Sequence, residues 1–210
     1  MHAEKLEQDM GVGPHTLSVP RIKQAENVET SKYPGVSDED FKHIVMVLRL
    51  AVPYTGLIIS TREDAALREE ALELGISQMS AGSCTAVGGY QSSKHKPQFE
   101  VDDHRSPGEV IKDLLLRGYI PSYCTACYRK GRTGDRFMRL AKSGQIGNIC
   151  TPNALLTLNE YLEDYGDDRL KKIGKQVIRE QLEMIKNDKV RAQAQEWIAC
   201  IDAGERDFRF

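Results

Sequence analysis

Long apolar runs are missing from the 210 residues of this chain, and none approaches the roughly 20 residues that a membrane-spanning helix needs. The first ten residues also lack the apolar stretch of a signal peptide. A large net charge is missing too, because 31 acidic side chains are balanced by 29 basic ones. Composition therefore gives no electrostatic case for a nucleic-acid or membrane partner. We expect a cytoplasmic protein with neither.

Cysteine is scarce, and the spacing of the few cysteines is informative. The chain has five, an odd number, which in a cytoplasmic protein disfavours a disulfide framework and favours metal binding or catalysis. Cys124 and Cys127 form a Cys-Thr-Ala-Cys motif, and Cys150 follows after 22 intervening residues. A structural zinc site uses four protein ligands, whereas three thiolates leave one coordination position open for chemistry.

Two metals are compatible with this spacing. Three thiolates can bind three irons of a [4Fe-4S] cluster and leave the fourth iron free. Soft sulfur also suits zinc, which would make the chain a zinc-stabilised interaction module. Zinc needs a fourth ligand. The candidates are His95, His104, Cys84 and Cys200, and none of them lies at a standard zinc spacing from the three cysteines. A redox Cys-x-x-Cys is less favoured, because the pair does not open a helix at the end of a strand.

Strands alternate with helices over the first 80 residues, which indicates a parallel sheet covered by helices. The expected elements are a helix ending at Gly11, strands at 16–22, 56–60 and 76–80, a helix from Ser37 to Pro53 and a helix at 65–74. Asp40 completes a capping box with Ser37. Three strands would leave two unpaired sheet edges, so we expect part of something larger.

Loop signals follow from residue 81 to 107, including the run Lys94-His95-Lys96-Pro97, and a long loop of this kind is usually functional or disordered. Ser106 and Pro107 then begin a helix that Gly118 ends. A short helix is expected near Thr133. Thr151 and Pro152 form an N-cap and first-turn pair, which would leave Cys150 just outside the next helix. Apolar residues at helical spacing after Asp168 predict ordinary packing.

The residues around the cysteines carry more information than their spacing. The run from Ser122, Ser-Tyr-Cys-Thr-Ala-Cys-Tyr-Arg-Lys-Gly-Arg-Thr-Gly-Asp-Arg-Phe-Met, and the run Cys150-Thr-Pro-Asn-Ala-Leu-Leu-Thr resemble the C-terminal region of the HydG family. These enzymes are radical SAM tyrosine lyases that mature [FeFe]-hydrogenase. The resemblance extends over nearly the whole chain through Gly11-Val-Gly-Pro-His-Thr, Val52-Pro-Tyr-Thr-Gly, Ser60-Thr-Arg-Glu and Ser80-Ala-Gly-Ser. The tyrosine lyase of thiamine biosynthesis shares the architecture, but Cys-x2-Cys-x22-Cys together with Gly-Pro-His-Thr favours the maturases.

The resemblance implies an α/β fold in which residues 1–82 form about three strand-helix units from the C-terminal portion of a TIM-type barrel. Residues 83–210 would form a mainly helical cluster-binding extension. Radical SAM enzymes bind their reductive cluster through Cys-x3-Cys-x2-Cys, and neither that motif nor the glycine-rich SAM-binding segment occurs here. On this interpretation the chain is inactive alone and works only with the missing N-terminal half of the barrel.

In that family, the 5′-deoxyadenosyl radical cleaves tyrosine between Cα and Cβ to give p-cresol, and the rest becomes the carbon monoxide and cyanide of an Fe(CO)(CN) synthon. The complete enzyme uses SAM and two [4Fe-4S] clusters, and its partners are the other hydrogenase maturation proteins. The resemblance assigns Cys124, Cys127 and Cys150 to the auxiliary cluster, which a free cysteine links to a labile extra iron. It assigns His2 to that iron, with His15 as a rival.

Arg62 and Ser60 are the candidate substrate-binding residues. Arg62 follows the expected strand 56–60, at the C-terminal mouth where barrel enzymes place their sites. Its guanidinium could hold the tyrosine carboxylate through two hydrogen bonds, with the Ser60 hydroxyl assisting. The alternative is an arginine at a helix start that pairs with Glu63. Three basic residues near the cysteines could balance cluster charge or lie in a solvated turn, and they are left out of the site: Arg129, Lys130 and Arg132.

Overall fold

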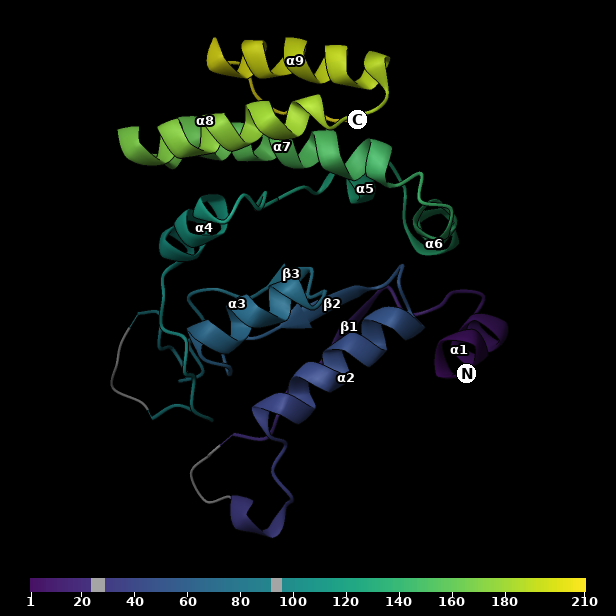
Figure 1. Cartoon of the computed structure of the whole chain (residues 1–210), viewed down its shortest axis with the longest axis vertical. Coiled ribbons are helices and arrows are strands. Elements are labelled where there is room, and N and C mark those ends of the chain that lie inside the picture. The colour runs from purple at the N-terminus through teal and green to yellow at the C-terminus, as the bar shows by residue number, and fades with distance from the viewer. Residues whose placement is uncertain (24–28, 92–95) are drawn as a thin grey trace. The chain divides into compact units, whose positions relative to one another are not determined.

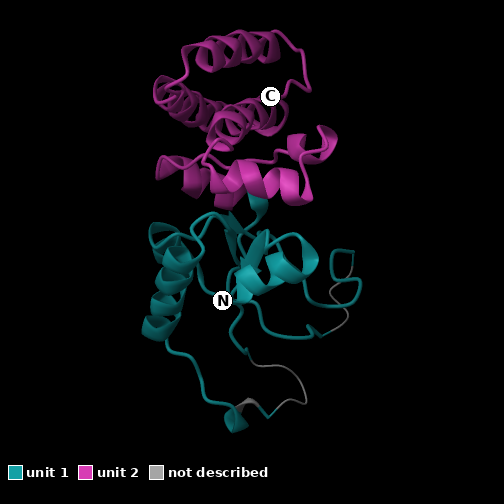
Figure 2. Ribbon diagram, turned by 90° about the vertical axis from the view of Figure 1, so that its right-hand side faces the viewer, with its two compact units in different colours: residues 1–107 teal, residues 108–210 magenta. Residues whose placement is uncertain are grey.

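In the computed structural model of this chain, the described residues are 1–23, 29–91 and 96–210. They form two compact units, Met1–Pro107 and Gly108–Phe210, which Figure 2 shows in different colours. Each unit has a hydrophobic core of its own. The predicted division at residue 82, between barrel and extension, stays a prediction. His95, a candidate zinc ligand, lies outside the described residues.

The first unit has α/β architecture around a small parallel sheet (Figure 1). Its three described strands lie in the order β1-β2-β3, both neighbouring pairs are parallel, and Leu17 lies opposite Leu57. The sheet confirms the predicted alternation of parallel strands and helices. In chain order the elements are α1 (His2–Met10), β1 (Thr16–Ser18), the 3-10 helix η1 (Thr30–Lys32), α2 (Asp38–Ala51), β2 (Gly56–Ile59), α3 (Ala65–Glu73) and β3 (Gln78–Met79).

Helix α2 begins as its sequence predicts. The Ser37 side chain accepts a hydrogen bond from the Asp40 backbone N–H at 3.1 Å and so satisfies a donor that the first helical turn leaves free. One face of the helix packs through Phe41 and Val45 onto a core that includes Leu57 of β2 and residues of α3. This shared core explains why a sheet of three short strands holds its helices.

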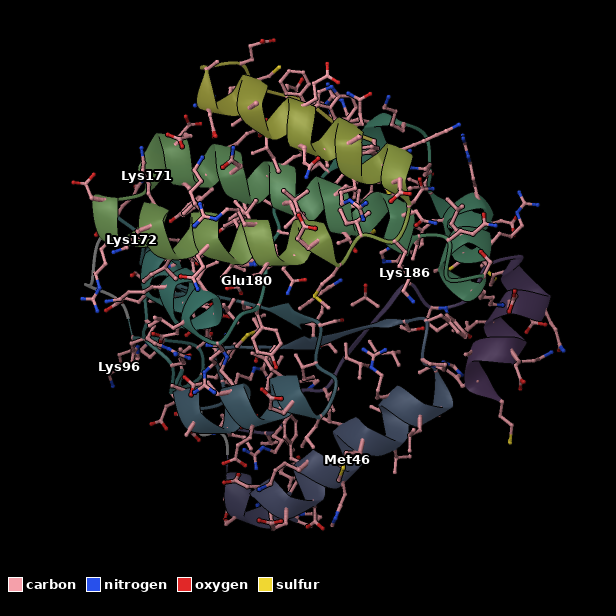
Figure 3. All side chains as sticks on the ribbon, turned by 45° about the horizontal axis from the view of Figure 1, so that its top comes forward. Met46, Lys96, Lys171, Lys172, Glu180 and Lys186 are labelled. Carbon is pink, nitrogen blue, oxygen red and sulfur yellow. The ribbon has the colours of Figure 1, made fainter. Side chains whose placement is uncertain are left out.

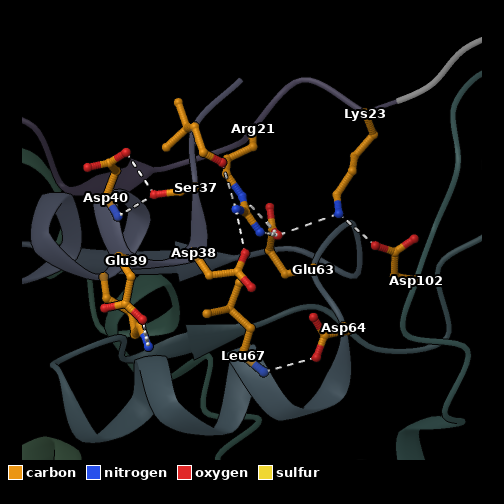
Figure 4. A network of polar contacts seen from close by, with 12 residues as sticks. Arg21, Lys23, Ser37, Asp38, Glu39, Asp40, Glu63, Asp64, Leu67 and Asp102 are labelled. Atoms are coloured by element: carbon orange, nitrogen blue, oxygen red, sulfur yellow. Dashed lines mark hydrogen bonds and ion pairs between the residues drawn. The ribbon is translucent and has the colours of Figure 1, made fainter. Parts of the chain in front are cut away.

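Charged side chains are buried beside the C-terminal ends of these strands. Glu63 is buried and pairs with Arg21 and with Lys23, as Figure 4 shows. Arg68 and Asp103 form a second buried pair, which Arg105 joins. Burial alone would raise the pKa of Asp103, but hydrogen bonds from Arg105 and the charge of Arg68 lower it to about 2. Both buried carboxylates are therefore neutralised by arginine.

The second unit is helical. Its elements are α4 (Pro107–Leu116), which starts at the last residue of the first unit, α5 (Ala126–Arg129), α6 (Gly134–Lys142), α7 (Gly147–Tyr165), α8 (Asp168–Glu183) and α9 (Asp188–Asp202). Pro107 begins α4 and Gly118 follows its end with φ of 79°, as predicted. The core of the unit joins α4, α7, α8 and α9, and the apolar positions predicted after Asp168 contribute to it.

Helix α8 packs closely against α7. Its buried face carries Gly174, and a Cβ atom added there would lie 2.4 Å from Cδ1 of Leu162 on α7. At one edge of this contact, Lys171 forms an ion pair with Glu163 at 3.1 Å. Lys172, which Figure 3 labels near Lys171, is exposed. A glycine is therefore required where the two helices approach most closely.

Within residues 1–23, 29–91 and 96–210, no helix has the length and the apolar character that a membrane span requires.

We predict that Gly174→Ala destabilises the second unit. Alanine favours a helix over glycine by about 1 kcal/mol, but overpacking a core costs about 1–3 kcal/mol, and Leu162 is fully buried. The free energy of unfolding should fall by about 1 kcal/mol, measured by urea denaturation. The matched control is Gly147→Ala in α7, where an added Cβ meets no atom within 4 Å. If Gly174→Ala unfolds at the wild-type urea concentration or above it, Leu162 can move aside and close packing does not require glycine.

Candidate metal centre

The three cysteines of the predicted metal site all belong to the second unit. Cys124 lies in the extended segment before α5, Cys127 lies within α5, and Cys150 lies in the first turn of α7. All three thiols are free. The fold therefore brings two distant stretches of sequence, 124–127 and 150, into one compact unit.

The Cys-x-x-Cys turn is built around the Cys124 sulfur. The Ala126 backbone N–H donates to Cys124 Sγ at 3.4 Å, and the Cys124 N–H donates to Ser122 Oγ at 3.3 Å. These two hydrogen bonds fix the position of Cys124 within the turn. The Tyr123 ring stacks on Tyr161 of α7 with centroids 5.5 Å apart. This stacking anchors the Cys-x-x-Cys segment to the helix that carries Cys150.

Cys150 lies inside helix α7 rather than before it, so the predicted N-cap at Thr151 is wrong. The backbone N–H groups of residues 147, 148 and 149 each donate to the carbonyl three residues back, which forms a tight turn. This turn starts the helix ahead of Pro152, which lies inside the helix and lacks the N–H that would bond the Asn148 carbonyl. Cys150 thus lies in a first helical turn, where the helix dipole favours an anionic thiolate.

The three sulfurs are electrostatically coupled. Although Cys150 is exposed on one side, partial burial raises the pKa of its thiol to about 11, and the negative charges of Cys127 and Cys124 add to the rise. The positive charge of Arg132 opposes it. Without a cation among them, three thiolates so close together repel one another. The site therefore favours a positively charged occupant.

The two candidate metals require different arrangements of their ligands. Over the described ranges, no group of three or more His, Cys, Asp or Glu side chains converges on a point where one ion could bind all of them. All ligands of a zinc ion lie within about 2.3 Å of a single centre, whereas each thiolate on a [4Fe-4S] cluster binds a different iron. The assignment of the three cysteines to a [4Fe-4S] cluster stays a prediction.

The other proposed zinc ligands in the described residues lie on other segments of the chain. Cys84 and His104 belong to the first unit. Cys200 lies on α9 of the second unit, where burial and the neighbouring Glu205 raise the pKa of its thiol.

The three basic residues beside the cysteines differ sharply in environment. Arg129 and Lys130 are exposed, and Arg129 pairs with Asp207. Arg132, in contrast, is only 9% exposed. The solvated-turn alternative therefore holds for Arg129 and Lys130 and is wrong for Arg132. Gly131 could have revealed this from sequence, because a left-handed glycine after a helix turns the next residue back toward the protein.

A small polar cavity lies beside Cys124. Its volume is about 140 Å³. The lining comes from both cysteine-bearing segments and from the C-terminal segment, and includes Arg129, Asn153, Glu160 and residues 207–209. The C-terminal segment therefore forms one wall beside the candidate metal centre.

The candidate substrate-binding residues lie in the first unit, directly after β2. The Ser60 hydroxyl oxygen accepts a hydrogen bond from the Arg62 backbone N–H at 3.3 Å. The Arg62 guanidinium lies over the Phe99 ring, 4.1 Å from its centroid. Glu63 pairs with Arg21 and Lys23, so the alternative of an Arg62–Glu63 pair is wrong.

The two candidate histidines also belong to the first unit. His2 is the first residue of α1 and is exposed. His15 is exposed at the start of β1, where its Nδ1 lies 3.0 Å from Thr16 Oγ1. The structure describes these histidines in one unit and the cysteines in the other.

The chain is similar to several known proteins. The biotin and thiamin synthesis associated domain matches residues 18–120. Two curated relatives are named 2-iminoacetate synthase. The Escherichia coli K12 protein is 29% identical over 139 residues, which are 64% of this chain and 36% of the relative. The Salmonella typhimurium LT2 protein is 32% identical over 111 residues, which are 51% of this chain and 28% of the relative.

Two solved structures match more of the chain. A crystal structure of HydG, a maturase of the [FeFe]-hydrogenase, is 58% identical in sequence to this chain, with a TM-score of 0.93. The match includes 100% of this chain and 46% of the HydG chain. The HydG structure from Carboxydothermus hydrogenoformans is 40% identical in sequence, with a TM-score of 0.73. This match includes 94% of this chain and 42% of that HydG chain. The chain spans less than half the length of these relatives. It belongs to the radical SAM family of HydG, the maturase of the [FeFe]-hydrogenase, as its sequence motifs predict.

Proposed function

We propose that this chain is the C-terminal part of a radical SAM tyrosine lyase that converts tyrosine to p-cresol, carbon monoxide and cyanide for [FeFe]-hydrogenase maturation. The observation that carries the proposal is the set of three coupled, free cysteines in a chain that is 58% identical to HydG over its whole length. Identity is higher to the two HydG structures than to the two 2-iminoacetate synthases, which favours the maturases.

Cys124, Cys127 and Cys150 would hold the auxiliary [4Fe-4S] cluster. Bound by three thiolates, such a cluster keeps one iron without a protein sulfur, and this iron supplies the attachment point for the extra iron. A backbone N–H donates to Cys124 Sγ, and the charge of Arg132 opposes the rise in the pKa of the Cys150 thiol that burial causes. A bound cation would offset the remaining cost of the buried thiolate.

Arg62 would bind the tyrosine carboxylate. The Phe99 ring contacts the face of its guanidinium, and a cation on an aromatic face keeps its N–H groups at the edge of the plane. Within the described structure those N–H groups make no hydrogen bond to protein. Their fork geometry suits a carboxylate. The Ser60 hydroxyl, which already orients the Arg62 backbone, would add a further donor.

His2 would bind the labile extra iron. Imidazole is a borderline ligand suited to iron, which also needs open positions for carbon monoxide and cyanide. His2 is exposed at the start of α1, so its ring is accessible to such an ion. His15, also exposed and next to β1, stays the alternative ligand.

We predict that replacing Cys124, Cys127 or Cys150 by serine abolishes cluster binding, because each thiolate is one of only three protein anchors. After anaerobic reconstitution, iron and sulfide analysis of the wild-type chain should give about four irons with charge-transfer absorption, and each variant should lose both. Cys84→Ser and Cys200→Ser are the matched controls and should keep the cluster. If either control loses iron as fully as Cys127→Ser, the three-ligand assignment is wrong. A colourless wild-type protein holding one zinc would instead support the interaction module.

We predict that the chain alone does not cleave SAM. With SAM and a strong reductant it should yield no 5′-deoxyadenosine above the no-protein background, because the Cys-x3-Cys-x2-Cys motif occurs nowhere in its 210 residues. Chromatography of the reaction mixture measures this directly. Product above background would mean that these residues contain a reductive cluster site after all.

We predict that Arg62 and His2 act at different steps of the complete enzyme. Arg62→Ala should lower kcat/KM for p-cresol and carbon monoxide together by about 10- to 100-fold, since a charged hydrogen bond contributes about 1.5–3 kcal/mol. His2→Ala should leave p-cresol unchanged and lower the iron carbonyl product, because it removes an iron ligand and spares the substrate site.

Parallel assays of p-cresol and iron-bound carbonyl separate these two effects. Arg62→Lys is the control that keeps the positive charge and lacks the planar guanidinium. Its kcat/KM for p-cresol should lie between the values of Arg62→Ala and the wild type. Normal iron carbonyl from His2→Ala would exclude His2 and favour His15. Equal p-cresol from Arg62→Ala and wild type would exclude Arg62 as the carboxylate ligand.

A further inference from the structure

Phe99 lies against the guanidinium that is proposed to bind the substrate carboxylate. The central carbon of the Arg62 guanidinium is 4.1 Å from the centroid of the Phe99 ring. Both side chains are half-buried, and both belong to the first unit. Because the Arg62 N–H groups donate to no protein group within the described residues, the contact with the ring sets the plane of the guanidinium.

The backbone of Arg62 is fixed by a turn directly after β2. The Arg62 N–H donates to Ser60 Oγ at 3.3 Å, and the Glu63 N–H donates to the Ser60 carbonyl oxygen at 3.4 Å. Thr61, between them, is buried. An arginine side chain keeps several rotatable bonds, so a fixed backbone alone does not fix the guanidinium. A second contact at the far end of the side chain is needed, and the Phe99 ring provides it.

The segment that carries Phe99 is anchored by backbone hydrogen bonds at the ring and after it. At the ring, Thr85 Oγ1 donates to the Phe99 carbonyl oxygen at 2.8 Å. Four residues later, the Asp103 N–H donates to the Thr61 carbonyl oxygen at 3.1 Å. Thr61 directly precedes Arg62 in the chain, so this second anchor connects the Phe99 segment to the turn that carries Arg62. The loop and the turn therefore hold the ring and the guanidinium together.

The anchor at Asp103 is strengthened by buried charge. The Asp103 side chain is 2% exposed and accepts hydrogen bonds from Arg68 and Arg105. Arg68 is itself fully buried and belongs to α3. Separating a buried ion pair leaves an uncompensated charge and is strongly unfavourable. The loop therefore stays docked beside the turn after β2, and Phe99 is available to Arg62 before any substrate binds.

We propose that Phe99 is a positioning residue for Arg62 and, through Arg62, for the carboxylate of the amino acid substrate. This inference rests on the proposed function. The ring covers one face of the guanidinium and leaves the N–H donors at its edge open for a carboxylate. A guanidinium that is already held in place loses less side-chain freedom on binding, which strengthens binding. Phe99 acts through Arg62 and needs no contact with the substrate.

The test measures kcat and KM for p-cresol formation by the complete enzyme, in the wild type and in Phe99→Leu, Phe99→Tyr, Arg62→Ala and the double variant Arg62→Ala/Phe99→Leu. Leucine keeps an apolar side chain and removes the aromatic face, whereas tyrosine keeps that face. Tyr90→Leu is the matched control, because it removes a ring from the same loop at a position that is 78% exposed. A circular dichroism spectrum of each variant shows whether it is folded.

We expect Phe99→Leu to raise the KM for tyrosine about fivefold, which is the typical effect of a cation–π contact at a partly exposed site. The kcat should stay close to wild type, because a loss of binding that is equal in the ground state and the transition state changes only KM. Phe99→Tyr and Tyr90→Leu should match the wild type. In the Arg62→Ala background, Phe99→Leu should cause no further loss, because the ring acts only through the guanidinium.

Two outcomes would overturn the proposal while leaving Arg62 as the carboxylate ligand. One is a KM of Phe99→Leu equal to that of Tyr90→Leu. The other is a Phe99→Leu effect of the same size with and without Arg62, which would mean that the ring supports the loop and not the guanidinium. If Phe99→Leu does not fold, Phe99→Met takes its place in both comparisons. If Arg62→Ala itself matches the wild type, the carboxylate assignment fails, and this inference fails with it.

Discussion

Burial of helix α7 is the constraint on which the second unit depends. Leu155, Leu156, Leu158 and Leu162 are all fully buried, and the core around them includes residues of α4, α8 and α9. A helix packed on this many faces can neither rotate nor slide without opening a cavity, and removing a buried leucine typically costs about 2–5 kcal/mol. The first turn of α7 therefore has a defined position, and Cys150 lies in that turn.

The weaker elements of the metal site are positioned by contacts to this helix. Helix α5 is a single turn and could not be stable alone, since isolated helices shorter than about 12–15 residues are marginal in water. The Tyr123–Tyr161 stack and the path from Arg132 through Phe210 to Asn153 connect its segment to α7. The arrangement of the three cysteines thus follows from long-range packing.

The sequence predicts the elements that begin or end at standard capping residues and misses element ends that depend on less regular backbone. The capping box at Ser37 and the proline and glycine around α4 mark helix ends through bonds within a few residues, and the structure confirms them. The start of α7 was predicted wrongly, because a tight turn of three backbone bonds starts it ahead of Pro152. Strand 16–22 shortens to Thr16–Ser18, ending before Pro20, which lacks a ladder donor.

The candidate site shows the same division. The cysteine spacing predicts a metal site within one compact unit, because both segments carry their own sequence signals. The difference between Arg129 and Arg132 could not be predicted by counting basic residues. It depends on where Phe210 returns, 78 residues later in the chain. The packing of Arg62 on Phe99 likewise depends on a loop far along the chain from β2.

The arginines separate into structural and functional sets by how completely their N–H donors are used. Arg49 donates to three backbone carbonyl oxygens, those of Pro53, Thr55 and Gly75, and so joins the end of α2 to two loops. Arg21 similarly uses its donors on Glu63, Asp38 and the Val36 carbonyl. Each of these two arginines uses four of its five N–H donors within the fold, which is typical of a structural role.

Arg62 and Arg132 differ from both, because each is held by contacts that leave donors free. An aromatic face holds Arg62, and a single carbonyl oxygen and its own backbone hold Arg132. Arg68 also has a buried Nε without a partner, yet Asp103 neutralises its charge. A fixed position together with unused donors is the combination that suits recognition of an anion, and Arg62 has both beside the proposed carboxylate site.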